Sequence, residues 1–190
     1  MRLRAVAGIV AGLAMAACSA AYVEEGQATV MLVVQSINDG SPLLSDVRTG
    51  DNNDTITNCV TSVGLTSILK NPGGPSSSSQ DIVLQRYDVS YVRSDGRAVE
   101  GVDVPYRFSE PMTASLAPGD ALKVSIDIVR HQAFLEQPLS QIAAGSIVEI
   151  TANVTFYGET ISRKAVSASG AASIRFADYA AGTTTCQTGT

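Results

Sequence analysis

Apolar and polar residues alternate along much of the second half of the chain. In residues 146–157, apolar residues occupy every second position from Val148 to Phe156, and polar residues from Glu149 to Thr155 fill the positions between them. Successive side chains of a β-strand point to opposite faces, so a period of two predicts a strand with one buried face and one solvated face. Apolar and small residues repeat in the same way from Val166 to Phe176, which predicts a second such strand.

Similar patterns predict further strands earlier in the chain. They lie at 28–37, 60–70, 81–93, 102–108, 112–117 and 121–130. After Asp81 the pattern places five residues on the inner face: Val83, Gln85, Tyr87, Val89 and Tyr91. In the 102–108 segment it places Val102, Val104, Tyr106 and Phe108 on one face, and Glu110-Pro111 ends that strand.

Turn residues separate these strands. Asp95-Gly96 predicts a hairpin turn, Pro118-Gly119-Asp120 predicts a hairpin between 112–117 and 121–130, and Tyr157-Gly158-Glu159 predicts the turn after the strand at 146–157. Residues 131–144 lack the period of two and contain Pro138, so we expect a crossover there with one helical turn.

Short strands with one wet face each, separated by frequent turns, predict two antiparallel sheets packed face to face. The fold class is therefore all-β, an immunoglobulin-like sandwich that follows an N-terminal signal segment, and an up-and-down barrel is the alternative. The expected organisation is a signal peptide at 1–17, a tether at 18–27, the β-sandwich domain at 28–179 and a flexible C-terminal tail at 180–190.

Two short stretches carry resemblances to known sandwich domains. Leu116 to Val124 resembles the L-x-P-G turn and strand that recur in many bacterial immunoglobulin-like domains. The run Leu69-Lys70-Asn71-Pro72, followed by 87–96 and then 116–129, resembles the order of elements in the desiccation-related LEA-type sandwich domain.

The N-terminus has the organisation of an export signal. Arg2 and Arg4 form a basic head, and the apolar run that follows, as far as Met15, is shorter than the roughly 20 residues of a membrane-spanning helix. Met15-Ala16-Ala17-Cys18 resembles the lipobox of bacterial lipoproteins. The resemblance implies cleavage before Cys18 and a lipid on that cysteine. Ser19 next to it implies the outer membrane of a Gram-negative bacterium. The alternative is an ordinary secretory signal cut near Ala20, and both readings export the chain.

Charge and composition disfavour several classes of partner. The formal net charge is −5, Trp is absent and aromatic residues make up 5 % of the chain. An acidic domain repels phosphate backbones, so nucleic acid is not an expected partner. Few aromatic residues also argue against a platform that stacks sugars or bases. The expected partners are the membrane, through the lipid on Cys18, and a protein of the envelope.

The two remaining cysteines, Cys59 and Cys186, are too far apart for a C-x-x-C redox pair. Disulfides persist in the oxidising compartments that exported proteins reach. We therefore expect Cys59 and Cys186 to form a disulfide that pins the tail to the sandwich. The alternatives are two free thiols, or pairing of Cys186 between molecules.

The polar stretch 38–58 is the one candidate for a metal site. Its aspartates include Asp51 and Asp54, whose oxygens suit a hard cation such as calcium, but their spacing does not match an EF-hand. A solvated loop in which Asn and Asp supply turn geometry is the favoured interpretation, so no metal and no cofactor is expected. His131, the only histidine, stands at the end of a predicted strand with no cysteine or other histidine nearby to complete a metal set, so it is interpreted as a surface residue. No G-x-S-x-G motif accompanies it, which argues against serine-based hydrolysis.

These observations predict a lipid-anchored envelope protein whose sandwich is non-enzymatic and has a structural or protein-binding role. A binding site is expected in loops at one end of the sandwich, among 38–58, 71–80 and 131–144. The alternative is a hydrolase or a metal-dependent enzyme with its site in the 38–58 loop.

Overall fold

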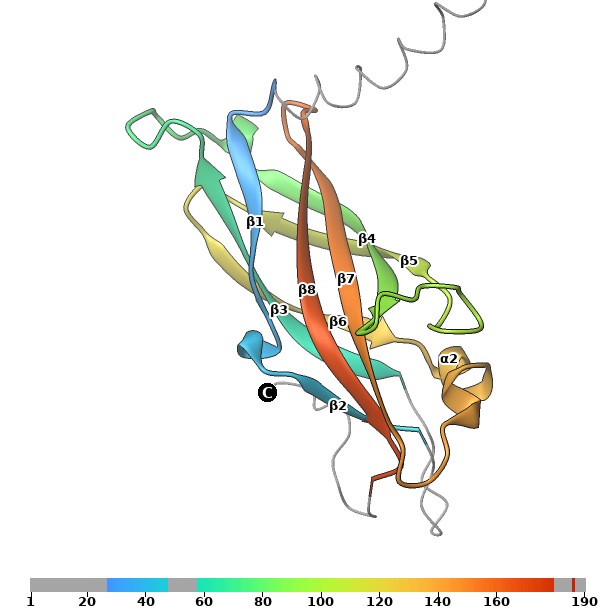
Figure 1. The fold of residues 1–190 in the computed structure, drawn as a ribbon. Coiled ribbons are helices and arrows are strands. Elements are labelled where there is room, and N and C mark those ends of the chain that lie inside the picture. The colour runs from blue at the N-terminus through green and yellow to red at the C-terminus, as the bar shows by residue number, and fades with distance from the viewer. Residues whose placement is uncertain (1–26, 48–57, 180–185, 187–190) are drawn as a thin grey trace, which may run out of the picture.

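The computed structural model describes residues 27–47, 58–179 and 186. Within these residues the chain forms strands in two layers, joined by short helical segments (Figure 1). In chain order the elements are β1 (Val30–Ile37), η1 (Asn38–Gly40), β2 (Leu43–Asp46), β3 (Cys59–Leu69), η2 (Ser78–Gln80), β4 (Ile82–Arg93), β5 (Phe108–Leu116), β6 (Ala121–Val129), α2 (His131–Leu135), η3 (Leu139–Gln141), β7 (Ile147–Thr160) and β8 (Ala165–Ala177).

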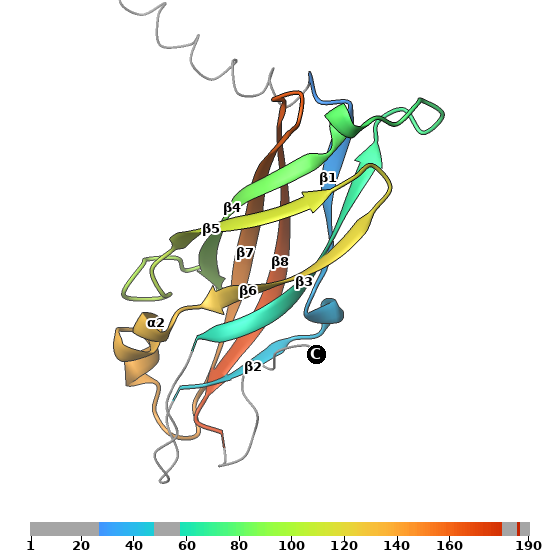
Figure 2. The same ribbon diagram turned by 180° about the vertical axis from the view of Figure 1, so that it is seen from behind.

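The strands form a three-stranded sheet of order β1-β3-β6 and a five-stranded sheet of order β2-β8-β7-β4-β5 (Figure 2). All neighbouring strands run antiparallel except β2 and β8, which run parallel. The orders β1-β3-β6 and β4-β7-β8 correspond to strands A-B-E and C-F-G of immunoglobulin-like sandwiches. The prediction of an all-β fold built from two sheets is confirmed.

Inward side chains of both sheets form one apolar core. Every second residue of β7 from Ile150 to Phe156 is fully buried, as its alternating pattern predicts. The sheets approach closely where β1 crosses β8, because a Cβ atom at Gly170 would lie 2.7 Å from Cγ1 of Val34. A glycine in the interior of a strand is expected at such a close contact.

The inner face of β4 differs from the predicted one in its first half. Ile82 and Leu84 are buried, whereas Val83 is half-buried and Gln85 is exposed. The pairing of β4 with both neighbours shifts register between Leu84 and Arg86, which is a β-bulge. A bulge inserts one residue and moves the following side chains to the other face. The prediction is therefore right from Tyr87 onward and wrong before it.

The turn predicted at Tyr157-Gly158-Glu159 is wrong. Gly158 lies inside β7, where it pairs with Leu84 on one side and Val166 on the other. A Cβ atom at Gly158 would lie 2.6 Å from the carbonyl oxygen of Val83, so the bulge of β4 leaves room only for glycine. The chain reverses instead at residues 161–164.

The strand predicted at 102–108 is also wrong. Residues 94–107 form a connection whose only pairing is an isolated bridge between Glu100 and Val104. The actual strand, β5, starts at Phe108 and continues through Pro111, where the prediction ended it. Proline is tolerated there because β5 is an edge strand and needs hydrogen bonds on one side only.

The predicted hairpin between 112–117 and 121–130 does not form, because β5 and β6 belong to different sheets. The turn between them is hydrogen-bonded to β3: the Gly119 amide donates to the Ser67 carbonyl at 2.8 Å, and the Ser67 amide donates to the Asp120 carbonyl at 3.2 Å. These bonds start the pairing of β6 with β3 and direct the chain across the sandwich edge.

The connections at 38–58 and 131–144 both contain short helical segments. The stretch 38–58, expected to be a loop, contains η1 and the short strand β2 in its described part. Residues 131–144 form the expected crossover, with α2 and η3 separated by Pro138. Phe134 of α2 packs edge-on against Phe176 of β8 with ring centroids 6.4 Å apart, which fixes the crossover to the core.

Candidate functional site

The two ends of the sandwich carry different segments. At one end lie the start of the described chain, the 71–80 loop and the turn between β7 and β8. Gln80 Nε2 donates to Thr29 Oγ1 at 2.9 Å, and Lys164 Nζ donates to Gln27 Oε1 at 2.7 Å. We name this the tether end, because the sequence up to Gln27 is the segment interpreted as a tether.

The opposite end, which we name the disulfide end, carries Cys59, α2 and the 94–107 connection (Figures 1 and 2). The amide of His131 donates to Asn58 Oδ1 at 2.8 Å, so the 131–144 crossover lies at this end. Of the loops named as candidates for a binding site, 131–144 therefore lies at the disulfide end and 71–80 lies at the tether end, so these two could not contribute to one site.

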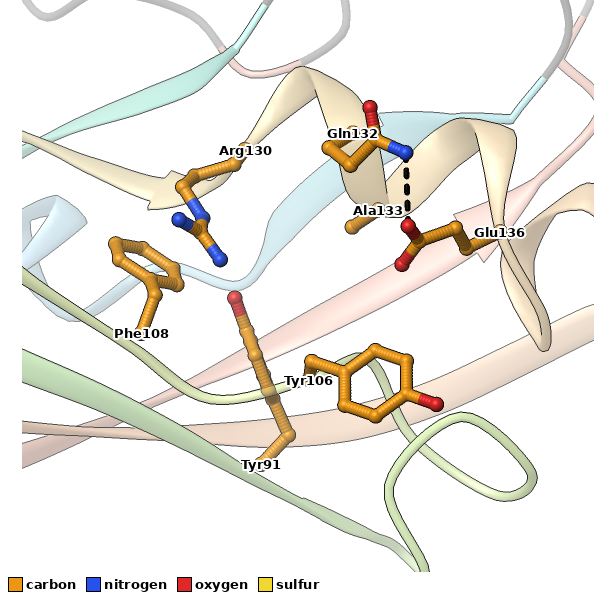
Figure 3. Close-up of a pocket in the computed structure, with 7 residues that line it drawn as sticks. All are labelled: Tyr91, Tyr106, Phe108, Arg130, Gln132, Ala133 and Glu136. Atoms are coloured by element: carbon orange, nitrogen blue, oxygen red, sulfur yellow. Dashed lines mark hydrogen bonds between the residues drawn. The ribbon is translucent and has the colours of Figure 1, made fainter.

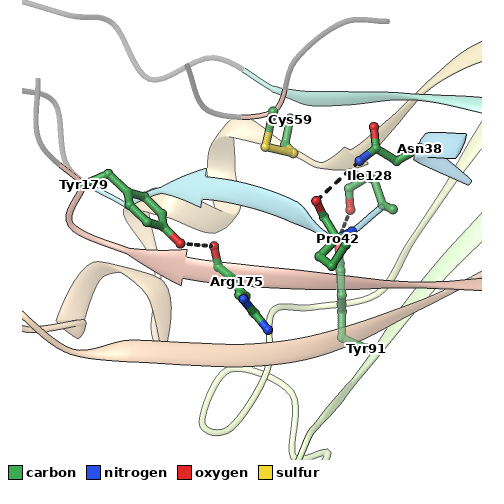
Figure 4. Close-up of a disulfide and its surroundings, with 8 residues drawn as sticks. Asn38, Pro42, Cys59, Tyr91, Ile128, Arg175 and Tyr179 are labelled. Atoms are coloured by element: carbon green, nitrogen blue, oxygen red, sulfur yellow. Dashed lines mark hydrogen bonds between the residues drawn. A yellow bond between two sulfur atoms is a disulfide. The ribbon is translucent and has the colours of Figure 1, made fainter. Parts of the chain in front are cut away.

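A disulfide joins Cys59 and Cys186, the pair that was expected, with their Cα atoms 4.9 Å apart (Figure 4). Cys59 is the first residue of β3 and is buried in the three-stranded sheet. The amide of Cys186 donates to the carbonyl of Leu44 in β2 at 2.8 Å. Cys186 is thus bonded to both sheets, through its disulfide to β3 and through its backbone amide to β2.

Tyr91 provides a second link between the sheets at this end. Its hydroxyl donates to the backbone carbonyl of Ile128 at 2.7 Å, from β4 to β6 (Figure 4). Burial raises the pKa of the Tyr91 hydroxyl above its usual range, and the charge of Arg130 opposes that rise. The hydroxyl therefore stays protonated and serves as a hydrogen-bond donor.

A small recess opens next to Tyr91 between α2 and the end of the 94–107 connection (Figure 3). Its lining residues are Tyr91, Tyr106, Phe108, Arg130, Gln132, Ala133 and Glu136. Its volume is about 20 Å³, which holds about one water molecule. It is far smaller than the pockets of several hundred Å³ that bind small organic ligands.

The charged groups of the recess are held by their neighbours. The guanidinium carbon of Arg130 lies 4.5 Å from the ring centre of Phe108, within the range of a cation–π contact. Gln132 Nε2 donates to Glu136 Oε1 at 2.7 Å, as Figure 3 shows. The charged side chains that line the recess are thus held by contacts with their neighbours. They do not converge on one point as a set of reactive groups would.

The two segments that border this recess, the 94–107 connection and α2, carry exposed apolar side chains. Val99, Val102 and Tyr106 come from the 94–107 connection and Leu135 from α2, and they are 59 %, 64 %, 52 % and 58 % exposed. We name these four residues the loop–helix surface. Tyr106 connects its two parts, because its ring packs on Gly101 and also lines the recess beside α2. Several large apolar side chains gathered at one place are typical of a protein contact surface.

A second cluster lies at the sandwich edge where β5 and β6 diverge. The hydroxyl of Tyr87 donates to Glu110 Oε2 at 2.9 Å and accepts from the amide of Asp127 at 3.1 Å. Burial raises the pKa of Tyr87, and the Glu110 carboxylate raises it further. Burial and the charge of Glu110 also raise the pKa of Asp127, while a hydrogen bond from Asn58 lowers it. The Tyr87 hydroxyl thus links the Glu110 carboxylate of one sheet to the backbone of Asp127 in the other.

The outer face of the five-stranded sheet is shallowly hollowed, with a volume of about 480 Å³. Polar residues such as Ser90, Asn153 and Tyr157 line the hollow. The guanidinium of Arg86 lies 4.0 Å from the ring centre of Tyr157 and forms an ion pair with Asp88 at 3.2 Å. This stacking covers one face of the tyrosine ring, so the ring is not an open platform there.

The remaining predicted residues are placed as follows. Cys18, Asp51 and Asp54 lie outside the described residues. His131 begins α2 and is half-buried, and its backbone amide donates to Asn58 Oδ1. In the described part of the chain, no group of three or more His, Cys, Asp or Glu residues is placed to hold a metal ion. The helices of that same part include none that is long and apolar enough to cross a membrane.

Comparison with known proteins adds the following. No protein-family model matches the chain, and no curated protein sequence matches it. Among solved structures, it is similar to a solution structure described as that of a late embryogenesis abundant (LEA) protein, with a TM-score of 0.43 and 12 % sequence identity over 89 % of this chain and 88 % of the other. The fold class of this chain is an all-β sandwich of two sheets, and it is assigned from the arrangement of the chain's own strands.

The loop–helix surface and the Tyr87 cluster are features that the sequence patterns did not indicate. Val102 and Tyr106 alternate like strand residues, and Leu135 has the helical spacing of a core residue. One signal was available: Pro105 next to Tyr106 disfavours a paired strand. For Tyr87, Glu110 and Asp127 no local signal existed, since they come from three strands.

Proposed function

We propose that this protein is exported, is anchored to the membrane by a lipid on Cys18, and uses its β-sandwich as a non-enzymatic module that binds another protein of the envelope. The observation that carries the proposal is the disulfide between Cys59 and Cys186. Disulfides persist in oxidising compartments and are rare in the bacterial cytosol. The disulfide therefore supports export independently of the N-terminal signal.

The loop–helix surface supports a binding role. Its four apolar side chains lie at the disulfide end, on a connection and a helix that the core holds in place through Val104 and Phe134. Rigid strands that present exposed apolar residues on their connections are a common arrangement for protein recognition. The 94–107 connection also carries ion pairs, such as Arg97 with Asp103 at 3.3 Å. Such pairs suit the polar rim that surrounds the apolar centre of a protein–protein interface.

Metabolic labelling with palmitate tests the anchor. Label should enter the wild-type protein and should be lost in Cys18→Ala, while Cys186→Ala, the control, keeps the label. Equal labelling of wild type and Cys18→Ala, or a mature N-terminus beyond residue 18, would contradict the lipid anchor.

Site-specific photo-crosslinking tests the binding role. A photoreactive residue at Val102, which is 64 % exposed, should yield one protein adduct in intact cells. The same residue at Ser115, exposed on β5, is the control and should yield none. Hydrolysis of ester, peptide or glycoside substrates that is abolished by His131→Ala would overturn the non-enzymatic proposal.

A further inference from the structure

The tether end carries its own exposed apolar side chains. Ile161, in the turn between β7 and β8, is 59 % exposed. Met31 and Ile68 lie opposite each other near the end of the β1–β3 pair and are 43 % and 41 % exposed. The β7–β8 turn, the start of β1 and the end of β3, which carry these residues, lie at the end where the described chain begins, opposite α2 (Figure 1).

The turn that presents Ile161 is held rigidly. The amide of Ile161 donates to the Asp81 carbonyl at 2.9 Å, and the amide of Ser162 donates to the Ser79 carbonyl at 3.0 Å. Two cations, Arg163 and Lys164, follow directly in the chain. An exposed apolar residue beside basic residues is the combination found where proteins rest in a membrane interface, since the apolar group enters the acyl boundary and the cations face the head groups.

The length of the preceding sequence limits where this end can lie. Gln27 is nine positions after Cys18, and an extended chain of that length spans at most about 30 Å. A lipid on Cys18 would therefore keep the tether end within that distance of the bilayer. Lys164 Nζ donates to Gln27 Oε1, which places the Ile161 turn next to the point where the tether joins the sandwich.

We infer that the tether end of the sandwich docks on the lipid surface, with Ile161 inserted as far as the acyl boundary and Met31 and Ile68 resting against the head groups. The inference depends on the lipid anchor proposed above. The lipid keeps the sandwich at the membrane, and the three apolar side chains fix which end faces it. The loop–helix surface then points away from the bilayer, toward other proteins.

A single tryptophan tests this orientation, because the chain contains none. Ile161→Trp is introduced into the full-length, acylated protein, which is then reconstituted into vesicles of phosphatidylethanolamine and phosphatidylglycerol. Docking should shift the tryptophan emission to shorter wavelength, and brominated acyl chains should quench most of it. Leu135→Trp, at the disulfide end and 58 % exposed, is the matched control and should show neither effect.

Each result decides the matter. Quenching of Ile161→Trp without quenching of Leu135→Trp supports the inference. Equal quenching at both positions, or none at either in protein that carries the lipid, overturns it while the anchor stands. Loss of palmitate labelling would show failure of the anchor itself. Ile68→Trp is a second probe in case Ile161→Trp does not fold, and it should be quenched in the same way.

Discussion

The two ends of the sandwich are held by different kinds of interaction. At the disulfide end, side chains join segments that are distant in sequence: Cys59 with Cys186, and Phe134 with Phe176. At the tether end, many of the contacts are between backbone groups of turns, such as the Lys70 amide donating to the Thr29 carbonyl at 2.9 Å. The stability of the disulfide end therefore depends on particular side chains. The stability of the tether end depends on close contacts between backbone segments.

The largest effect is expected from removing the disulfide. The cysteines are 127 residues apart, so opening the bond frees a long loop in the unfolded chain. The double variant Cys59→Ala/Cys186→Ala should lose up to about 5 kcal/mol of unfolding free energy on the chain-entropy estimate. Urea denaturation of the purified protein measures it. A reducing agent should lower the stability of the wild type and leave that of the double variant unchanged. A double variant as stable as the wild type would show that the disulfide end does not depend on this bond.

At the tether end the corresponding change is Gly158→Ala. The added methyl would meet the Val83 carbonyl oxygen at 2.6 Å, and backbone cannot move aside as a flexible side chain does. We expect a loss of about 2 kcal/mol, as for overpacked sites. Gly73→Ala, where a Cβ atom meets nothing within 4 Å, is the control and should change stability by less than about 0.5 kcal/mol. Equal effects at both glycines would show that close backbone contact is unimportant.

A smaller effect is expected from Thr160→Val in the β7–β8 turn. Thr160 is buried, and its hydroxyl accepts from the Lys164 amide at 3.0 Å and pairs with Ser162 Oγ at 2.9 Å. Loss of this hydroxyl should cost about 1 kcal/mol, measured by thermal or urea unfolding. Thr113→Val, at an exposed position of β5, should be neutral. A neutral Thr160→Val would mean that the turn does not need its side-chain bonds.

The smallest effect concerns the pH dependence at Asp127. Burial and the nearby Glu110 raise the pKa of Asp127 in the folded state, so the folded protein holds this proton more tightly than the unfolded chain does. The free energy of unfolding should therefore fall as pH rises from the ordinary Asp value near ~3.9 through the raised pKa. In Asp127→Asn that fall should be smaller. Parallel unfolding-free-energy profiles for wild type and variant, measured across acidic to neutral pH, would contradict this assignment.

The sequence patterns were reliable where a strand is regular and covered on one face. In β7, Ile150 to Phe156 alternate with polar residues, and burial follows that alternation. The patterns failed where one strand depends on another. The bulge at Gln85 and the glycine at position 158 explain each other, but they lie in different strands, so neither is informative alone.

The candidate surfaces were less predictable than the fold. The exposure of Tyr106 depends on the 94–107 connection leaving the sheet, and that of Leu135 depends on how α2 packs on Phe176. The exposure of both side chains follows from tertiary packing, which the local alternation of apolar and polar residues does not encode. The disulfide was expected because an export signal indicates an oxidising compartment and Cys59 and Cys186 are the two cysteines left beside Cys18, although free thiols and pairing between molecules remained alternatives.

The hydrogen bond from the Cys186 amide to Leu44 has a consequence for self-association. Sheets with open edges invite strand-by-strand addition of further copies, which leads to aggregation. In the five-stranded sheet, Cys186 occupies a backbone acceptor of the short edge strand β2, and Pro111 removes a donor from the edge strand β5 at the other side. Each border of this sheet therefore offers one backbone group fewer to an incoming strand, which disfavours the addition of further copies at β2 and at β5.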